Sequence, residues 1–469
     1  MMLFLLSVVV GKHSHKQTFY NGDRKSPWFV VAFGMIGTTI SGVTFVSVPG
    51  EVANSSFCYF QFVMGNIVGY VLIATLLLPY YYRKNVLSIY SVLEKKMGQE
   101  GYLVTSGFFI LSKIIGAAFR LFLATLVIFL AISEPLGISF EATIFFSLAA
   151  IWLYTFRSGI KTVVWSDTIQ TIILVTAVIS SIIVISSQLD LTLSGFLKDT
   201  MSHPETKIFN FEWNSENNFF KQFVAGIFMT LALNGFDQDI MQKNLTCRNE
   251  RKARKNMLWF TFFFGIVVFL FLILGELLIG FAQAKGIAIP AKTDQLYPLL
   301  ALNHMGSFIA IMFILGISAA AFSSADSATT ALTTAFCVDF LKIQNKPEKH
   351  QRKIRNLVHL SFSALIFIVI LLFYKLNNDS VVVSIFKAAG YTYGPILGVF
   401  IFAFFFDRKP KPNAILPVCV VSPLLTYSIT IVSKQLFSNF NFGFELIIIN
   451  AFLTILFLTL FSKKIKKRI

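Results

Sequence analysis

Charged residues and cysteines are scarce in this chain. Only 13% of its 469 residues are Asp, Glu, Lys or Arg, whereas a soluble domain contains about 25%. The four cysteines, Cys58, Cys247, Cys337 and Cys419, are scattered, and nothing in their spacing suggests a disulfide framework or a zinc site. Phosphate-binding loops, H-E-x-x-H motifs and G-x-S-x-G elbows are absent as well. We therefore expect a protein that is not an enzyme.

Apolar residues dominate instead. They make up 55% of the chain, the mean hydropathy is +0.71, and long apolar stretches alternate with short basic loops. This pattern predicts an all-α polytopic membrane protein with about 13 transmembrane segments. The predicted segments are 1–11, 27–54, 59–80, 101–131, 139–156, 163–187, 220–241, 257–282, 299–338, 356–374, 381–406, 413–433 and 441–462.

The net charge of +17 is unevenly distributed. Most Lys and Arg residues fall in alternate loops, beginning with the loop after the first segment. By the positive-inside rule this places the N-terminus outside and the C-terminus inside a cytoplasmic (inner or plasma) membrane. The basic excess is thus explained by topology, and we expect the lipid bilayer but no nucleic acid as a partner. The oligomeric state stays open.

The first segment, 1–11, is too short to span a membrane, because a transmembrane helix needs about 20 residues. It also lacks the basic stretch and the cleavage site of a signal peptide. We expect residues 1–26 to hold a truncated first helix and a basic loop. Segment 299–338 is too long for one straight crossing, so 299–304 is expected in the external loop or at the interface.

Two segments contain local breaks. In 27–54 the glycines Gly34, Gly37 and Gly42 surround small hydroxyl residues, and in 220–241 the pair Asn234-Gly235 precedes Asp237. The two segments begin successive five-helix blocks, 27–187 and 220–406, which are inverted relative to each other because five is odd. Paired breaks of this kind indicate a transporter binding site at mid-membrane. The loop 188–219 and the two C-terminal helices with a basic tail, 407–469, lie outside the repeats.

Residues 318–327 place several hydroxyls and one carboxylate inside an apolar helix. A carboxylate at that depth costs about 2.5–3.5 kcal/mol on insertion scales, so something must compensate it. Hard oxygen atoms packed this closely suit a small cation. The cluster therefore indicates half of an ion site.

The stretch 159–170, GIKTVVWSDTIQ, resembles the signature of the sodium:solute symporters, the family of the sodium/glucose, proline and iodide cotransporters. Ser158 and Ser166 depart from the usual glycine and threonine, and stretches 34–50, 235–242 and 319–327 agree as well. The resemblance implies the inverted five-helix-repeat fold of the leucine transporter. It also implies Na⁺ as the coupling ion. The main sodium site that it implies consists of two backbone carbonyls and an Ala-x-x-Ser-Ser element: Gly37, Ile40, Ala320, Ser323 and Ser324.

A second ion or proton site is implied by the same resemblance. Some members of the family bind a second sodium with hydroxyls matching Ser323 and Ser327 and a carboxylate matching Asp167. Asp326 stands where relatives usually have a small or apolar residue, and it would strengthen such a site or carry a proton. The alternative is that Asp326 pairs with a buried cation, for which three are available: Lys113, Arg120 and Lys387.

Six residues are candidates for substrate binding: Thr44, Gln61, Arg120, Asp237, Gln238 and Lys387. Asp237 stands where sugar transporters carry an amide, which argues against glucose or galactose. Arg120 could clamp a substrate carboxylate through two parallel hydrogen bonds, or it could neutralise Asp237 or Asp326. This mixed lining favours a charged or zwitterionic solute.

The function that this sequence predicts is sodium-coupled symport, which imports a small polar organic solute by alternating access. A proton-coupled carrier on the same fold, with Asp326 or Asp167 as the titrating group, is the first alternative. A membrane sensor that has lost transport is less well supported, because such sensors usually append cytosolic signalling domains. The identity of the solute and the number of sodium ions per solute stay open.

Overall fold

The computed structural model describes residues 18–155, 159–191, 206–376, 381–436 and 442–464. The prediction of a truncated helix at 1–11 lies outside them. Within the described residues, eight helical stretches are long and apolar enough to cross a membrane. A ninth crossing is formed if the bent pair α11 and α12 counts as one span, and three shorter apolar helices accompany them. Every predicted segment from 27–54 onward coincides with a helix or a broken helix.

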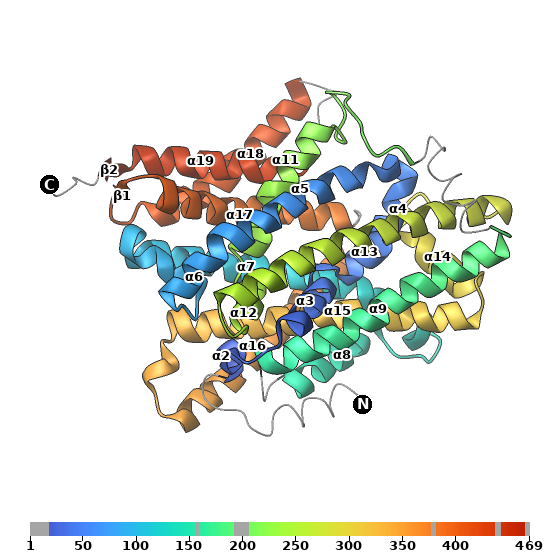
Figure 1. The fold of residues 1–469 in the computed structure, drawn as a ribbon, viewed down its shortest axis with the longest axis horizontal. Helices are drawn as coiled ribbons and strands as arrows, with labels where there is room; N and C mark the ends of the chain where they lie inside the picture. The colour runs from blue at the N-terminus through green and yellow to red at the C-terminus, as the bar shows by residue number, and fades with distance from the viewer. Residues whose placement is uncertain (1–17, 156–158, 192–205, 377–380, 437–441, 465–469) are drawn as a thin grey trace.

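The helices form a bundle in which most axes run along a common direction (Figure 1). The first predicted block contains α3 (Trp28–Thr39), α4 (Gly42–Ser55), α5 (Tyr59–Leu72), α6 (Leu78–Lys84), α7 (Glu94–Ile128), α8 (Phe140–Thr155) and α9 (Ile160–Gln188). The second contains α11 (Phe219–Thr230), α12 (Gln238–Leu245), α13 (Glu250–Ala284), α14 (Leu296–Asn303), α15 (Ser307–Ala335), α16 (Glu348–Leu376) and α17 (Val381–Phe405). Outside the blocks lie α2 (Thr18–Asn21), α18 (Ile415–Leu436), α19 (Leu446–Leu460) and a short antiparallel pair, β1 (Arg408–Pro410) with β2 (Ser462–Lys464).

Both predicted breaks are confirmed. The first lies between α3 and α4, where Ile40 leaves the helical region (φ −83°, ψ 89°) and Ser41 caps α4. The second follows a π-helical turn, Leu231–Gly235, after which the chain bends by 65° into α12. Asp237 caps α12, because its side chain accepts a hydrogen bond of 2.8 Å from the N–H of Asp239. Each break leaves helix-end backbone groups without intrahelical partners.

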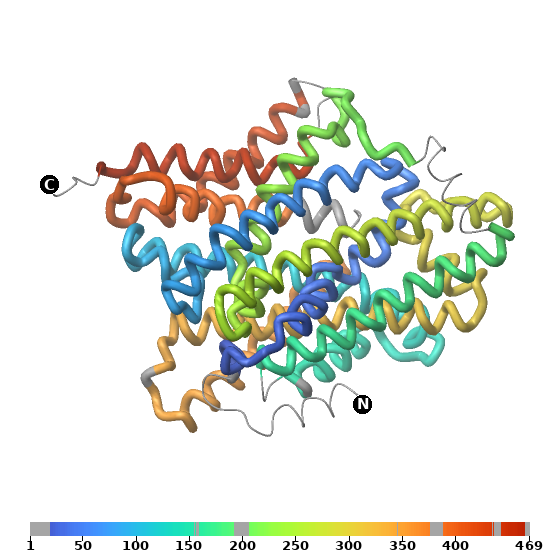
Figure 2. Tube along the Cα trace, viewed as in Figure 1, coloured from blue at the N-terminus to red at the C-terminus, as the bar shows by residue number. Residues whose placement is uncertain are grey.

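The broken helix of the first block packs closely on two long helices. α3 lies against α9, and α13 runs beside α3 and α4 (Figure 2). The contact with α9 depends on Gly37, whose N–H donates to Thr171 Oγ1 over 2.9 Å. A Cβ at position 37 would lie 2.4 Å from that oxygen. Glycine is therefore required at this crossing.

The structure agrees with one predicted segment boundary and differs from another. Residues 299–304 fall in and just after α14, separate from the crossing helix α15, as expected. The prediction that segment 220–241 ends at residue 241 is wrong. Helix α12 continues to Leu245, and Lys243, which lies beyond the predicted end of the segment, is 1% exposed. The helix continues because its residues 238–245 are all buried against neighbouring helices.

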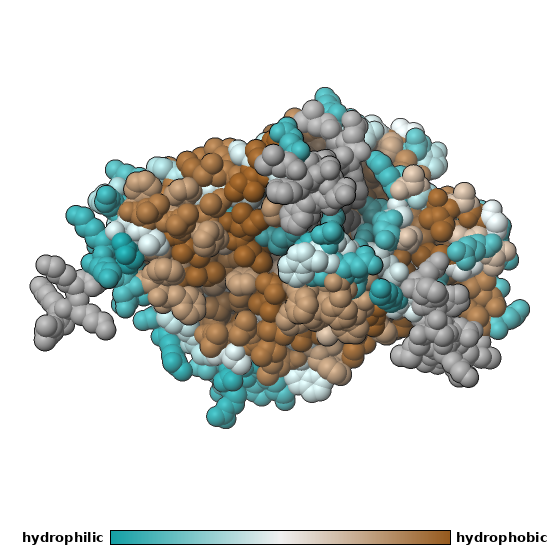
Figure 3. Space-filling view, turned by 90° about the horizontal axis from the view of Figure 1, so that it is seen from above, coloured by the Kyte–Doolittle hydropathy of each residue, from teal (hydrophilic) through white to brown (hydrophobic). Residues whose placement is uncertain are grey.

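The exterior of the bundle is apolar. Large hydrophobic side chains are exposed on the long helices, among them Phe146, Ile183, Phe262 and Leu357. In Figure 3 hydrophobic residues cover a broad area of the face shown, and hydrophilic residues gather toward its edges. This surface fits a multi-pass membrane protein, whose lipid-facing side chains have no need to be polar.

Candidate functional site

A cavity of about 740 Å³ lies between the two broken helices, and α7, α15 and α17 complete its wall. Its mouth is lined by exposed residues such as Asn54, Glu216 and Lys292. Its deep end is lined by buried residues that include Thr38, Asp237 and Asp239. The cavity therefore opens at one end of the bundle and closes at the other.

Charged side chains at the deep end are paired with one another. Lys113 Nζ on α7 lies 3.2 Å from Asp237 Oδ2 and 2.8 Å from Asp239 Oδ2. Tyr393 on α17 donates to Asp237 Oδ2 over 2.7 Å. All four side chains are buried. Pairing makes this burial possible, because an isolated charge would be strongly destabilised there.

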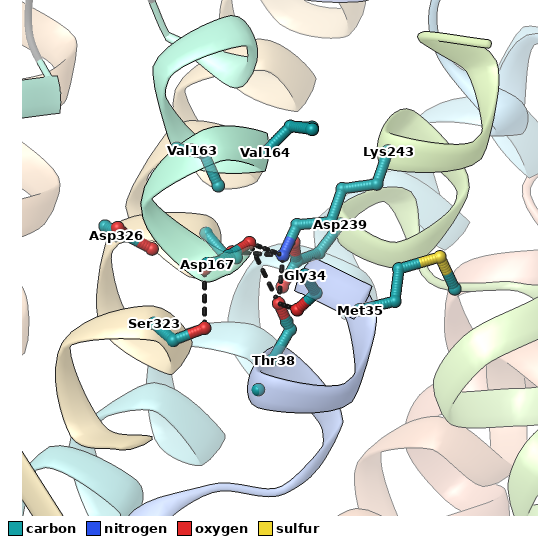
Figure 4. A network of polar contacts seen from close by, with 12 residues as sticks. Gly34, Met35, Thr38, Val163, Val164, Asp167, Asp239, Lys243, Ser323 and Asp326 are labelled. Atoms are coloured by element: carbon teal, nitrogen blue, oxygen red, sulfur yellow. Dashed lines mark hydrogen bonds and ion pairs between the residues drawn. The ribbon is translucent and has the colours of Figure 1, made fainter. Parts of the chain in front are cut away.

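A second charged cluster surrounds Lys243 of α12 (Figure 4). Its Nζ lies 2.6 Å from Asp167 Oδ2 on α9 and 2.5 Å from Ser327 Oγ on α15, and it also donates to Thr38 Oγ1 on α3. Both charged groups are almost completely buried, at 1% exposed for Lys243 and 0% for Asp167. Asp239 Oδ1 lies 3.9 Å from Lys243 Nζ and so links the two clusters.

Sequence reasoning missed Lys243. One signal was present, since Asp239 and Lys243 stand at positions i and i+4, where helical side chains meet. That spacing also occurs on ordinary solvated helices, so it does not by itself indicate burial.

The residues predicted for the main sodium site lie at the break between α3 and α4 and on α15. A Cβ at Gly37 would be 3.5 Å from Ser323 Oγ, which places the end of α3 against this serine. Ser323 donates to Asp167 Oδ1 over 2.5 Å. Ser324 lines the cavity, and its buried Oγ has no hydrogen-bond partner among the described residues. Ile40 and Ala320 are buried.

Comparison with known proteins identifies the family. The model of the sodium:solute symporter family matches residues 19–420. The chain belongs to this family. It is a sodium-coupled solute symporter, with Na⁺ as its coupling ion, and a transporter rather than an enzyme.

Individual relatives agree with this assignment. The sodium/sialic acid symporter NanT of Aliivibrio fischeri is 24% identical over 85% of this chain and 80% of its own length. The sodium-coupled monocarboxylate transporter 2 of Danio rerio is 22% identical over 69% of this chain, which spans about half (52%) of that relative. The solved structure of a substrate-bound, outward-open Na⁺-coupled sialic acid symporter superposes with a TM-score of 0.82 at 20% identity, covering 99% of this chain and 97% of that one. The predicted fold class is thereby confirmed.

In this symporter, Asp326 lies apart from the Lys243 cluster. It is buried on α15 and accepts a hydrogen bond of 3.2 Å from Ser166 Oγ. Lys243 donates its three N–H groups to Thr38, Asp167 and Ser327 instead. The structure therefore brings together Asp167 and Ser327 of the predicted second site, and Lys243 contacts both of them. Asp326 lies on the other side of Asp167 from Lys243 (Figure 4). Lys113, considered as a partner of Asp326, pairs with Asp237 and Asp239 instead.

The substrate candidates separate into those in the cavity and those outside its lining. The cavity is lined by Thr44, Arg120 and Asp237. Gln61 is buried beside it, where its amide holds the backbone of Cys58, Asn210 and Asn217. Gln238 holds the backbone of Leu87 and Ile89. The Lys387 side chain lies outside the described residues.

Proposed function

We propose that this symporter imports a small organic solute carrying a carboxylate, which Arg120 binds. The single observation that supports this is the state of the Arg120 side chain. It is half-buried in the cavity wall, and no hydrogen bond or ion pair joins its guanidinium to another described residue. A planar guanidinium in a cavity is suited to hold a carboxylate through two parallel hydrogen bonds.

The charge of Arg120 is available because the nearby carboxylates already have partners. Lys113 pairs with both Asp237 and Asp239. An anionic solute in the cavity would thus meet the Arg120 guanidinium, which forms no ion pair with another described residue. The cavity volume of about 740 Å³ falls within the range of small-molecule sites.

Two of the relatives support the same class of solute. The two described above are named for sialic acid and for monocarboxylates, and both kinds of molecule carry a carboxylate. Their identity to this chain is low, so the solute itself is not transferred. A carboxylate is the feature they share.

Sodium would bind where α3 ends and α15 passes. The proposed ligands are the backbone carbonyls of Gly37 and Ile40 together with Ala320, Ser323 and Ser324. The buried oxygen of Ser324, which has no hydrogen-bond partner in the part of the chain that the structure describes, supports this assignment, because such a group costs free energy unless something satisfies it. A cation there would join the broken helix of the first repeat to the second repeat, and would raise solute affinity by linkage.

We place the N-terminus outside and the C-terminus inside a cytoplasmic membrane, following the loop charges. With this orientation the cavity mouth, near Glu216 and Lys292, faces outward. The structure would then represent the outward-facing state of an importer. Repeats 27–187 and 220–406 would move against each other to open the other end.

A panel of solutes tests the proposal by thermal unfolding of the purified protein, with and without sodium. A carboxylate should raise the melting temperature more in sodium than in potassium, and its neutral amide analogue should not. Arg120→Gln should abolish this response, and Arg120→Lys should weaken it, whereas Arg83→Gln at an exposed site serves as the control. Unchanged carboxylate binding in Arg120→Gln would reject the role of Arg120.

A further inference from the structure

The oxygen atoms around Lys243 form a set that would otherwise suit a small cation. Asp167, Ser327 and Thr38 come from three different helices, α9, α15 and α3, and an oxygen of each accepts a hydrogen bond from the same nitrogen, Lys243 Nζ. Figure 4 shows Asp167 and Thr38 beside that nitrogen. Carboxylate and hydroxyl oxygens are hard ligands of the kind that alkali and alkaline-earth cations prefer. Two of the three residues, Asp167 and Ser327, are those predicted for a second ion.

The ammonium of Lys243 occupies that point. An ammonium has three N–H donors, and the three oxygens accept all of them. It carries the same single positive charge as a sodium ion. A free cation entering here would lose its ligands to the lysine and would meet a like charge at close range, which is strongly unfavourable in a buried site.

We propose that Lys243 is a built-in substitute for the second cation, so that this symporter carries one sodium ion with each solute. Because the ammonium is tethered to α12, it neutralises Asp167 without being released as cargo. This inference rests on the proposed function, because the one sodium ion that is carried would bind at Ser323 and Ser324.

The Lys243 ammonium belongs to a larger set of buried ion pairs at the deep end of the cavity. The connected ion pairs join two lysines, Lys113 and Lys243, with three aspartates, Asp167, Asp237 and Asp239. Within this set Lys243 already pairs with Asp167, so a second sodium ion at Asp167 would add a positive charge without a partner.

Counting sodium sites on the purified protein tests the inference without any solute. Equilibrium binding of radioactive sodium should give one site per wild-type chain and one more in Lys243→Ala, where the lysine has left its three oxygens. The added site should disappear in the double variant Lys243→Ala/Asp167→Asn. Lys252→Ala, at an exposed position of α13, is the matched control and should keep the wild-type count.

These sodium counts test the main sodium site and the role of Lys243 separately. The wild-type count tests the main sodium site, and the difference between Lys243→Ala and wild type tests the role of Lys243. Two sites in the wild type, or no gain in a folded Lys243→Ala, would overturn the inference. If Lys243→Ala does not fold, the ratio of sodium to solute fluxes in wild-type proteoliposomes decides: one supports the substitute cation, and two rejects it.

Discussion

At the scale of single residues, Ser324 differs from its neighbours on α15. Ser323 donates to Asp167, and Ser327 contacts both Asp167 and Lys243. The Ser324 hydroxyl is equally buried but has no partner among the described residues. A buried hydroxyl in this state costs about 1–3 kcal/mol. The cost is offset if a cation completes its contacts during the transport cycle.

Replacing Ser324 with Ala should therefore weaken sodium binding by about ten- to a hundredfold, because a contact between a polar group and a charge contributes about 1.5–3 kcal/mol. Stability without sodium should hold or rise, since no hydrogen bond is lost. Sodium-dependent shifts in melting temperature measure both quantities. Ser361→Ala on α16, an exposed serine, is the control. Sodium affinity that is unchanged in Ser324→Ala would remove this residue from the site.

At the scale of elements, the breaks and the small-residue cluster could be predicted because their signals are local. Glycines and serines inside apolar stretches are visible in the sequence whatever surrounds them. The position of Lys243 could not be predicted in the same way. Its burial follows from the 65° bend before α12, which turns this short helix into the bundle. Its partner Asp167 lies 76 positions away, and no local pattern joins the two.

The contact between α3 and α9 is similarly non-local, because Gly37 and Thr171 are 134 positions apart. The Cβ introduced by Gly37→Ala would lie 2.4 Å from Thr171 Oγ1, so one helix must shift. We expect a loss of about 1–3 kcal/mol, which is typical of overpacking. Thermal unfolding of the sodium-free protein measures it.

A double variant shows whether the loss of stability in Gly37→Ala comes from the clash with Thr171. Thr171→Ala removes the clashing oxygen, so the double variant Gly37→Ala/Thr171→Ala should be more stable than Gly37→Ala alone. Additive losses in this double-mutant cycle would refute the steric explanation. Gly280→Ala on α13 is the control, since nothing lies within 4 Å of its added Cβ and helix propensity then favours alanine.

At the scale of the whole molecule, the structure is open at one end and sealed at the other. The cavity reaches exposed residues near Glu216, whereas at the opposite end α6 is hydrogen-bonded to the end of α12 and the residues after it. Tyr82 on α6 donates to the carbonyls of Asn244 and Cys247 over 2.9 Å each. Alternating access requires this end to open, so Cys247 lies where the change should be detected.

Cys247 should react slowly with thiol reagents in this state. Its side chain is 0% exposed, and burial raises the pKa of its thiol from 9.0 to about 12. Only the thiolate reacts, so very little of this thiol would be reactive at pH 8. The labelling rate should rise tenfold per pH unit up to pH 10 without levelling, whereas the rate of Q344C, at an exposed position in the turn between α15 and α16, should level near pH 9. Both rates are measured in a background in which the remaining cysteines are alanine.

Removing sodium in the presence of solute should accelerate labelling of Cys247, because the sealed end then opens. A rate that levels near pH 9 in sodium would show that this end is already open to solvent.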